Sequence, residues 1–271
     1  LGMVSQGPTV ILIRVTNGGA GLGNLSRYPA FMDPQFPAAL AEEIRALIVE
    51  FPTITHIVIG NESNPWWRDV SEAQRNQFVA VVRETMSAVV GERPGVKVGV
   101  SVAYSVADEP IIADMYRRIM PDFMSYNGYG SGPGWLWLGP DAGIQVLDRL
   151  KAHATSLGAP LAIGELGYGS AESLNSSLSE QAEFFRRARA WCQSSDVLFC
   201  NTFIGLDGRD CKAAAQMLGG GSEPSEAMKT YLCTAGQMTS SAVPKPAWDA
   251  WLKGSFLAPR PPILLLDEGT S

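Results

Sequence analysis

The chain has 271 residues, of which 46% are hydrophobic and 18% are charged, and these values are typical of a globular protein with a sizeable core. Its formal net charge of -6 and its pI near 5.0 argue against a surface that binds nucleic acid. No apolar run reaches the roughly 18 residues that a membrane span needs. The composition therefore predicts no nucleic-acid partner and no membrane partner.

The cysteines and histidines limit the possible chemistry. Four cysteines show no metal-ligand spacing: Cys192, Cys200, Cys211 and Cys233. Two disulfides would fit an oxidising compartment and hence a secreted protein, whereas four buried free thiols are the alternative. Because His56 and His153 are the only histidines, a zinc site or a histidine-based catalytic site has few residues to use.

Short apolar runs alternate with longer stretches of helical periodicity along the chain. Pro37 suits a first helical turn, Ser71 suits an N-cap and Gly158 suits a C-cap. In chain order the pattern predicts strand 9–15, helix 36–51, strand 56–60, helix 71–92, strand 96–104, helix 109–120, strand 122–129, helix 141–158, strand 160–166, helix 178–194, strand 197–203 and helix 246–254.

Six strands separated by helices indicate an α/β protein with a parallel sheet and right-handed crossovers. A doubly wound sheet and a (β/α)8 barrel both suit this pattern. Residues 255–271, after the last predicted helix, are expected to be a C-terminal tail or linker.

Two of the predicted strands end in the same way, since "HIVIGNE" (56–62) and "PLAIGELG" (160–167) each lead from an apolar run through glycine to glutamate. Parallel α/β sheets place their active sites at the carboxyl ends of strands. A single glutamate there is more simply a loop cap or a solvated charge. A pair of carboxylates, Glu62 and Glu165, is instead what glycosidic cleavage requires, with one acting as an acid and the other as a nucleophile or base.

Aromatic residues follow three of these strands and would offer flat faces for sugar rings, although packing in the core or in loops is the alternative for each. They are Trp66, Trp67, Tyr129, Trp135 and Trp137.

The two motifs together resemble clan A of the glycoside hydrolases, which are retaining (β/α)8 barrels. In that clan the acid/base glutamate follows an asparagine at the end of the fourth strand, and the nucleophile glutamate ends the seventh. The resemblance implies that Glu62 is the acid/base, that Glu165 is the nucleophile and that Asn61 binds the sugar 2-hydroxyl. It extends over residues 9–254, including "PKPAWDAW" (244–251), which resembles the last helix of many clan members.

The resemblance also implies a set of substrate-binding residues. Tyr129 matches a tyrosine that contacts the nucleophile, Asn127 stands where histidine is common, and Phe203 stands where the family usually has tryptophan. The complete expected set is Asn61, Asn127, Tyr129, Trp66, Trp67, Trp135 and Phe203. The implied partner is a carbohydrate, either an oligo- or polysaccharide or a glycoside, and no cofactor and no metal is implied.

If Glu62 ends the fourth strand of the barrel, that strand is the predicted strand 56–60, and only one predicted strand, 9–15, precedes it. The expected fold is then an N-terminally incomplete (β/α)8 TIM barrel with strands 3 to 8 present, occupying residues 1–254. The start at Leu1 rather than methionine favours a processed chain or a fragment of a longer one.

Two other functions are considered. The stretch "VTNGGAGLG" (15–23) resembles the dinucleotide-binding turn of short-chain dehydrogenases, but prolines follow it where a helix is needed, and no Tyr-x-x-x-Lys pair is found. A non-catalytic carbohydrate-binding barrel would use the same aromatic residues for binding alone.

Overall fold

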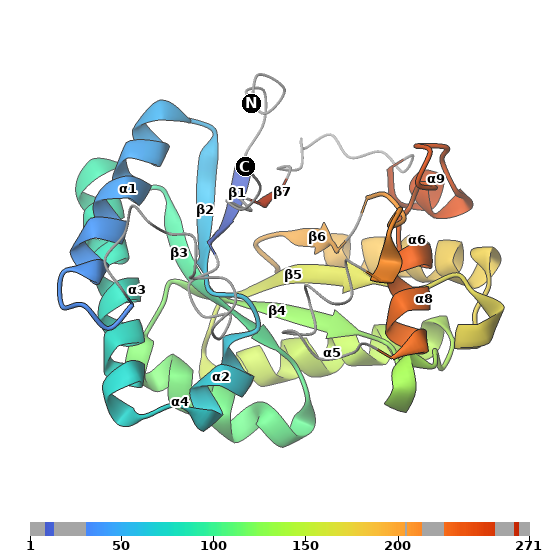
Figure 1. The fold of residues 1–271 in the computed structure, drawn as a ribbon, viewed down its shortest axis with the longest axis horizontal. Coiled ribbons are helices and arrows are strands. Elements are labelled where there is room, and N and C mark those ends of the chain that lie inside the picture. The colour runs from blue at the N-terminus through green and yellow to red at the C-terminus, as the bar shows by residue number, and fades with distance from the viewer. Residues whose placement is uncertain (1–8, 14–30, 204, 213–224, 253–262, 266–271) are drawn as a thin grey trace. The chain divides into compact units, whose positions relative to one another are not determined.

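The computed structural model describes residues 9–13, 31–203, 205–212, 225–252 and 263–265. Its elements are drawn in Figure 1. The strands are β1 (Thr9–Ile13), β2 (Ile54–Ile59), β3 (Lys97–Ala103), β4 (Phe123–Tyr129), β5 (Leu161–Gly167), β6 (Cys200–Thr202) and β7 (Ile263–Leu265). The α-helices are α1 (Phe36–Glu50), α2 (Ser63–Asp69), α3 (Glu72–Glu92), α4 (Glu109–Ile119), α5 (Pro140–Leu157), α6 (Leu178–Ser194), α8 (Glu226–Thr234) and α9 (Pro246–Leu252).

The chain divides into two compact units. The first unit comprises residues 1–126, 154–161 and 259–271, and the second comprises residues 127–153 and 162–258. Hydrogen-bonded strands follow the order β7–β1–β2–β3–β4 in the first unit and β4–β5–β6 in the second, since β4 contributes residues to both. The pairs β1–β2, β2–β3, β1–β7 and β5–β6 are parallel. Parallel strands connected through helices define an α/β architecture.

In the first unit, parallel strands pack against amphipathic helices. The register pairs Leu12 of β1 with Val58 of β2, and Ile59 of β2 with Val100 of β3. Ile59 and Val100 have 0% exposure, as Phe78 on α3 does. Strands buried on both faces read as continuous apolar runs, which is why β2 and β3 were recognisable in the sequence.

The helix ends in the first unit follow local sequence signals. Pro37 lies in the first turn of α1, as expected. Ser71 forms a capping box with Gln74, because the Ser71 hydroxyl accepts the Gln74 N–H while the Gln74 side chain accepts the Ser71 N–H. The predicted N-cap of this helix is therefore confirmed.

The second unit contains β5, β6 and the helices α6, α8 and α9. Two disulfides lie within it, Cys192–Cys200 and Cys211–Cys233, with Cα–Cα distances of 6.4 and 5.5 Å. The first joins the end of α6 to β6, and the second joins the segment after β6 to α8. Of the two alternatives left open by the sequence, the structure has the disulfides.

Among the described residues, two α-helices and one strand had no counterpart in the sequence prediction. The residues after "IGNE" form helix α2 rather than a loop, and residues 226–234 form helix α8. Within the expected C-terminal tail, residues 263–265 form β7, which pairs with β1. Each of these elements is short, with seven, nine and three residues, so each offers little periodicity to recognise. Among the helices that the structure describes, none is long and apolar enough to cross a membrane.

Candidate active site

Glu62 lies in the turn between β2 and α2 and has an unusual backbone conformation. Its φ of 49° and ψ of 51° fall in the left-handed region, although it is not glycine. Gly60, two residues earlier, also has a positive φ of 76°, so the chain turns sharply where the strand ends. A non-glycine residue in this region costs of order 1 kcal/mol or more and persists only where surrounding contacts impose it.

Contacts with β3 impose this turn within the first unit. The Glu62 N–H donates to the Ser101 hydroxyl oxygen at 3.3 Å, and Ser101 is 1% exposed. The Asn64 side-chain oxygen accepts the Ala103 N–H at 2.8 Å, and Asn64 has 0% exposure. In each of these two hydrogen bonds a backbone N–H donates to the oxygen of a buried side chain. The loop that carries Asn61 and Glu62 is therefore held against the end of β3.

The two tryptophans after Glu62 lie on α2 and differ in their environments. Trp66 is half-buried and makes edge contacts with Phe31 and Phe78, each at a ring distance of 5.7 Å. Trp67 is 1% exposed, and its indole N–H donates to Asp114 at 2.9 Å. The Arg118 guanidinium lies 5.2 Å from the Trp67 ring centre. Trp67 therefore packs as a core residue, whereas part of Trp66 reaches solvent.

Glu165 lies on β5 in the second unit and is 8% exposed. The Tyr129 hydroxyl, from the end of β4, donates a hydrogen bond to the Glu165 carboxylate oxygen Oε2. Hydrogen bonds from a neutral donor to a carboxylate are stronger than those between neutral groups and fix the orientation of the acceptor. The contact between Tyr129 and Glu165 that the sequence suggested is present.

Two of the other expected residues join this pair through ring contacts. Tyr129 lies 6.0 Å from Trp135 and 5.8 Å from Phe203, measured between ring centres. Trp135 and Phe203 are half-buried, and Trp135 ends a short 3-10 helix, Pro133–Trp135. Asn127 is 2% exposed and occupies β4 two residues before Tyr129, so both side chains project from the same face of the strand.

The structure thus groups the expected residues within each unit. In the second unit, Glu165, Tyr129, Trp135 and Phe203 form one connected cluster. In the first unit, Asn61 and Glu62 occupy the turn after β2, and Trp66 lies on the helix that this turn begins. The motif "VTNGGAGLG" at 15–23 lies outside the described residues.

The sequence reasoning missed Tyr231, which contributes a ring to the cluster in the second unit. Tyr231 lies 6.0 Å from Tyr129 and 4.9 Å from Trp135, and it is 1% exposed. It is carried by α8, whose only strong local signal is Ser225, an N-cap that accepts the Met228 N–H. That signal marks the start of a helix but says nothing about the chemistry around it.

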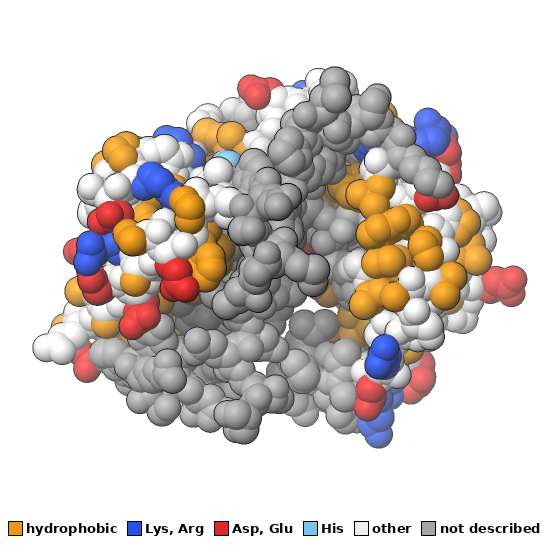
Figure 2. Space-filling model, turned by 90° about the horizontal axis from the view of Figure 1, so that it is seen from above, with side chains coloured by type: hydrophobic (Ala, Val, Ile, Leu, Met, Phe, Trp, Pro, Cys, Tyr) orange, Lys and Arg blue, Asp and Glu red, His pale blue; other side chains and the backbone are white. Residues whose placement is uncertain are grey.

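A surface hollow in the second unit lies away from this cluster. It has a volume of about 740 Å³ and is lined by residues of α6, of the segment before α6 and of α9, and none of the expected site residues lines it. Figure 2 shows hydrophobic side chains gathered on the right of one face. Exposed large hydrophobic residues of the second unit include Leu178, Val243 and Leu252.

Among the described residues, no group of three or more acidic, histidine or cysteine side chains could hold a metal ion.

No family model matches the chain, and no curated protein is similar to it in sequence. Solved structures with a similar fold include glycoside hydrolases. The catalytic domain of a GH53 protein from Ignisphaera aggregans has a TM-score of 0.59 and 16% identity, covering 90% of this chain and 73% of that one. A monomeric beta-xylosidase from Caulobacter crescentus CB15 has a TM-score of 0.55 and 17% identity, covering 83% of this chain and 46% of that one.

A beta-glucuronidase from Bacteroides uniformis has a TM-score of 0.54 and 14% identity, covering 82% of this chain. The chain spans only 26% of that enzyme's length. At these identities the likeness establishes the fold, which the chain shares with glycoside hydrolases of several kinds.

Proposed function

We propose that the chain is the catalytic part of a retaining glycoside hydrolase, in which Glu165 is the nucleophile and Glu62 is the acid/base. The observation that carries the proposal is the hydrogen bond from Tyr129 to the buried Glu165 carboxylate at the carboxyl end of a parallel strand. A buried carboxylate that is oriented by a phenol, with aromatic rings beside it, suits attack on a sugar ring. The fold shared with glycoside hydrolases supports the same reaction class.

In the first step of the proposed reaction, a Glu165 oxygen attacks the anomeric carbon. The bond from that carbon to the leaving-group oxygen breaks, and Glu62 donates a proton to this oxygen. The product is a glycosyl ester of Glu165. Tyr129 keeps the attacking carboxylate oriented, and Asn61 binds the 2-hydroxyl, where a hydrogen bond strengthens in the transition state.

In the second step, Glu62 removes a proton from water, and the water oxygen attacks the anomeric carbon. The bond to Glu165 breaks, so the carboxylate is restored and the sugar leaves with its original configuration. The strained backbone of Glu62 supports a functional role, because such strain concentrates at active sites. Trp66, Trp135 and Phe203 are the proposed sugar contacts, since each is half-buried.

We also propose that this reaction takes place in a (β/α)8 barrel, of which β1 to β6 are the third to eighth strands, and that residues 1–254 belong to it. The proposed substrate is a glycoside or an oligo- or polysaccharide. The two disulfides favour an oxidising compartment, and hence secretion.

The test is hydrolysis of a panel of 4-nitrophenyl glycosides by the full chain and its Glu165→Gln variant. The variant is expected to lose turnover by about three orders of magnitude or more, because a neutral amide cannot form the glycosyl ester. NMR of the first-formed product is expected to show retained anomeric configuration. Undiminished hydrolysis by Glu165→Gln, or an inverted product, would reject the mechanism.

Glu62 is tested separately by Glu62→Gln. Substrates with a poor leaving group are expected to lose far more rate than 4-nitrophenyl glycosides, because only the poor leaving group needs the proton. The retaining mechanism further requires a carboxyl separation of about 5–5.5 Å in the active protein. Binding of oligosaccharide without hydrolysis of any substrate would favour the non-catalytic carbohydrate-binding alternative.

A further inference from the structure

Tyr231 packs against several rings of the aromatic cluster in the second unit. It stacks on Trp135 at 4.9 Å and on Phe203 at 6.1 Å, with interplanar angles of 21° and 7°. It also contacts Trp137 at 5.8 Å and Tyr129 at 6.0 Å. Edge and stacked ring pairs stabilise one another beyond the burial of their area, so this arrangement holds the Tyr129 ring in place.

Gly167 shows that Tyr231 and Tyr129 pack against the same point of β5. A Cβ atom at Gly167 would overlap the Tyr231 hydroxyl and would lie 2.8 Å from Cε1 of Tyr129. Gly167 follows Glu165 by two residues, so both face the same side of the strand. The Tyr231 hydroxyl and the Tyr129 ring therefore occupy the strand face that carries the Glu165 carboxylate.

The end of the helix that carries Tyr231 is held by three donors. The carbonyl oxygen of Thr234, the last residue of α8, accepts hydrogen bonds from Ser170 Oγ, Gln181 Nε2 and Lys245 Nζ, each at 3.0 Å. A cation at a helix C-terminus is also favoured by the helix dipole. The position of α8 is thus set by residues from three other segments of the second unit.

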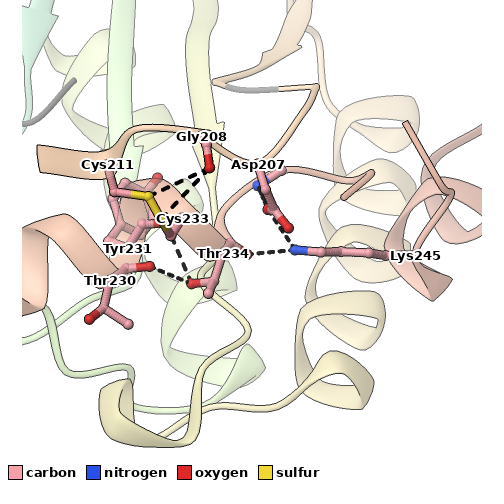
Figure 3. Close-up of a disulfide and its surroundings, with 9 residues drawn as sticks. Asp207, Gly208, Cys211, Thr230, Tyr231, Cys233, Thr234 and Lys245 are labelled. Carbon is pink, nitrogen blue, oxygen red and sulfur yellow. Dashed lines mark hydrogen bonds and ion pairs between the residues drawn. A yellow bond between two sulfur atoms is a disulfide. The ribbon is translucent and has the colours of Figure 1, made fainter. Parts of the chain in front are cut away.

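Lys245 is the charged member of this anchor, and Figure 3 shows dashed lines from its ammonium to Thr234 and to Asp207. Its ammonium lies 2.7 Å from the Asp207 carboxylate and the side chain is 7% exposed. Burial raises the pKa of Asp207, and the nearby Lys245 opposes that rise. A buried ion pair is a weak source of stability, but it imposes one geometry because neither charge tolerates losing its partner.

The Cys211–Cys233 disulfide holds the same end of α8 covalently. Cys233 lies next to Thr234 and two residues after Tyr231, and its partner Cys211 follows β6 (Figure 3). The Asp207 carboxylate also accepts the Gly236 N–H at 2.9 Å, just beyond the helix. Two independent restraints, one ionic and one covalent, therefore fix the helix within a turn of Tyr231.

We infer that Tyr231 is a positioning residue that holds the Tyr129 phenol against Glu165, and that the Lys245–Asp207 pair serves this purpose by fixing α8. The lysine of "PKPAWDAW", Lys245, thereby acquires a role in holding the end of α8. The catalytic importance of this arrangement rests on the proposed function, but the positioning itself does not.

The experiment measures the coupling between Tyr129 and Glu165 with and without Tyr231. Urea unfolding of Tyr129→Phe, Glu165→Gln and the double variant yields their coupling, expected to be about fivefold or more in the unfolding equilibrium constant. In a Tyr231→Leu background the coupling is expected to fall below twofold. An unchanged coupling in that background overturns the inference, whether or not the chain hydrolyses any glycoside.

Phe185→Leu is the matched control, because Phe185 is equally buried in the second unit but contacts Phe184 and Trp251 instead. This variant is expected to lower stability and leave the coupling intact. Loss of the coupling in Phe185→Leu as well would show a general loosening and would overturn the inference.

A second pair of variants covers the case in which Tyr231→Leu does not fold. Tyr231→Phe keeps the ring and is expected to keep the coupling, whereas Lys245→Met combined with Asp207→Asn is expected to reduce it at least twofold. The reverse result for both overturns the inference.

With a hydrolysed substrate, Tyr231→Leu is expected to lower kcat about tenfold with KM within twofold, and Tyr231→Phe to restore most of the rate. If Glu165→Gln leaves hydrolysis unchanged, the proposed function fails while the coupling result stands.

Discussion

Glu62 and Glu165 both follow apolar strands, but different parts of the chain hold them. Glu62 is half-buried, has a left-handed backbone, and lies in a segment that is held to β3 by hydrogen bonds from backbone N–H groups to the side chains of Ser101 and Asn64. Glu165 is 8% exposed, continues a regular strand, and is held by the side chain of Tyr129. The Glu62 carboxylate is placed by the backbone conformation of its turn, and the Glu165 carboxylate is placed by side-chain packing.

This difference fits the two proposed roles. A nucleophile must present one oxygen along a fixed line of attack, which a directed hydrogen bond and a close-packed ring provide. An acid/base must exchange protons in both steps, and partial access to solvent suits that exchange. Substitutions should therefore affect the two regions in opposite ways.

Gly167→Ala should produce the largest change in stability. The added methyl would overlap the Tyr231 hydroxyl and the Tyr129 ring, and overpacking of this kind costs about 1–3 kcal/mol or more. Thermal unfolding should show a marked fall in Tm. Gly91→Ala, on α3, is the control: a Cβ there meets nothing within 4 Å, so a small gain in stability is expected. Equal effects of both changes would show that the Gly167 contacts are loose.

Tyr129→Phe should have the next largest effect. Removing the hydroxyl leaves the buried Glu165 carboxylate without this donor, and a hydrogen bond to a charged group contributes about 1.5–3 kcal/mol. Urea unfolding at pH 7 measures the loss. The same change in a Glu165→Gln background should cost less, because the charge is then absent. An identical cost in both backgrounds would contradict the contact.

Glu62→Asn should increase stability while abolishing the proposed acid/base. Asparagine adopts the left-handed region more readily than glutamate, so relief of strain should add up to about 1 kcal/mol. Urea unfolding, compared with Glu62→Gln, separates the backbone effect from the loss of charge. The sign of the change in the free energy of unfolding distinguishes the two carboxylates, because Glu165→Asn should destabilise the protein. A loss of stability in Glu62→Asn relative to Glu62→Gln would show that its turn is not strained.

The smallest expected effect is a pH dependence in the first unit. Burial lowers the pKa of His56 on β2, with Lys97 contributing. As the pH falls through the ordinary histidine value of 6.5, the unfolded chain takes up a proton that the folded chain does not. The free energy of unfolding should then decrease between about pH 7 and pH 5. His56→Gln should flatten this slope, and the difference between the two unfolding profiles measures it.

The sequence alone was sufficient for β2, β5 and the N-cap at Ser71, because apolar runs and caps are set by neighbouring residues. It also identified Glu62 and Glu165 as strand-end carboxylates and, through the family resemblance, the contact of Tyr129 with Glu165. The strands, the cap and the positions of the two glutamates are local properties of the chain, whereas the contact of Tyr129 with Glu165, 36 positions apart, came only from the resemblance.

Only the tertiary structure separated Trp66 from Trp67, since two adjacent aromatic residues look alike until one is packed against Asp114 and Arg118. It likewise brought Tyr231 to Tyr129 and Lys245 to Asp207, pairs separated by about a hundred and by 38 positions. Such contacts depend on how helices are placed against strands, and no local periodicity encodes that placement. The sequence therefore determined which residues could carry the chemistry, and tertiary packing decided how they are held.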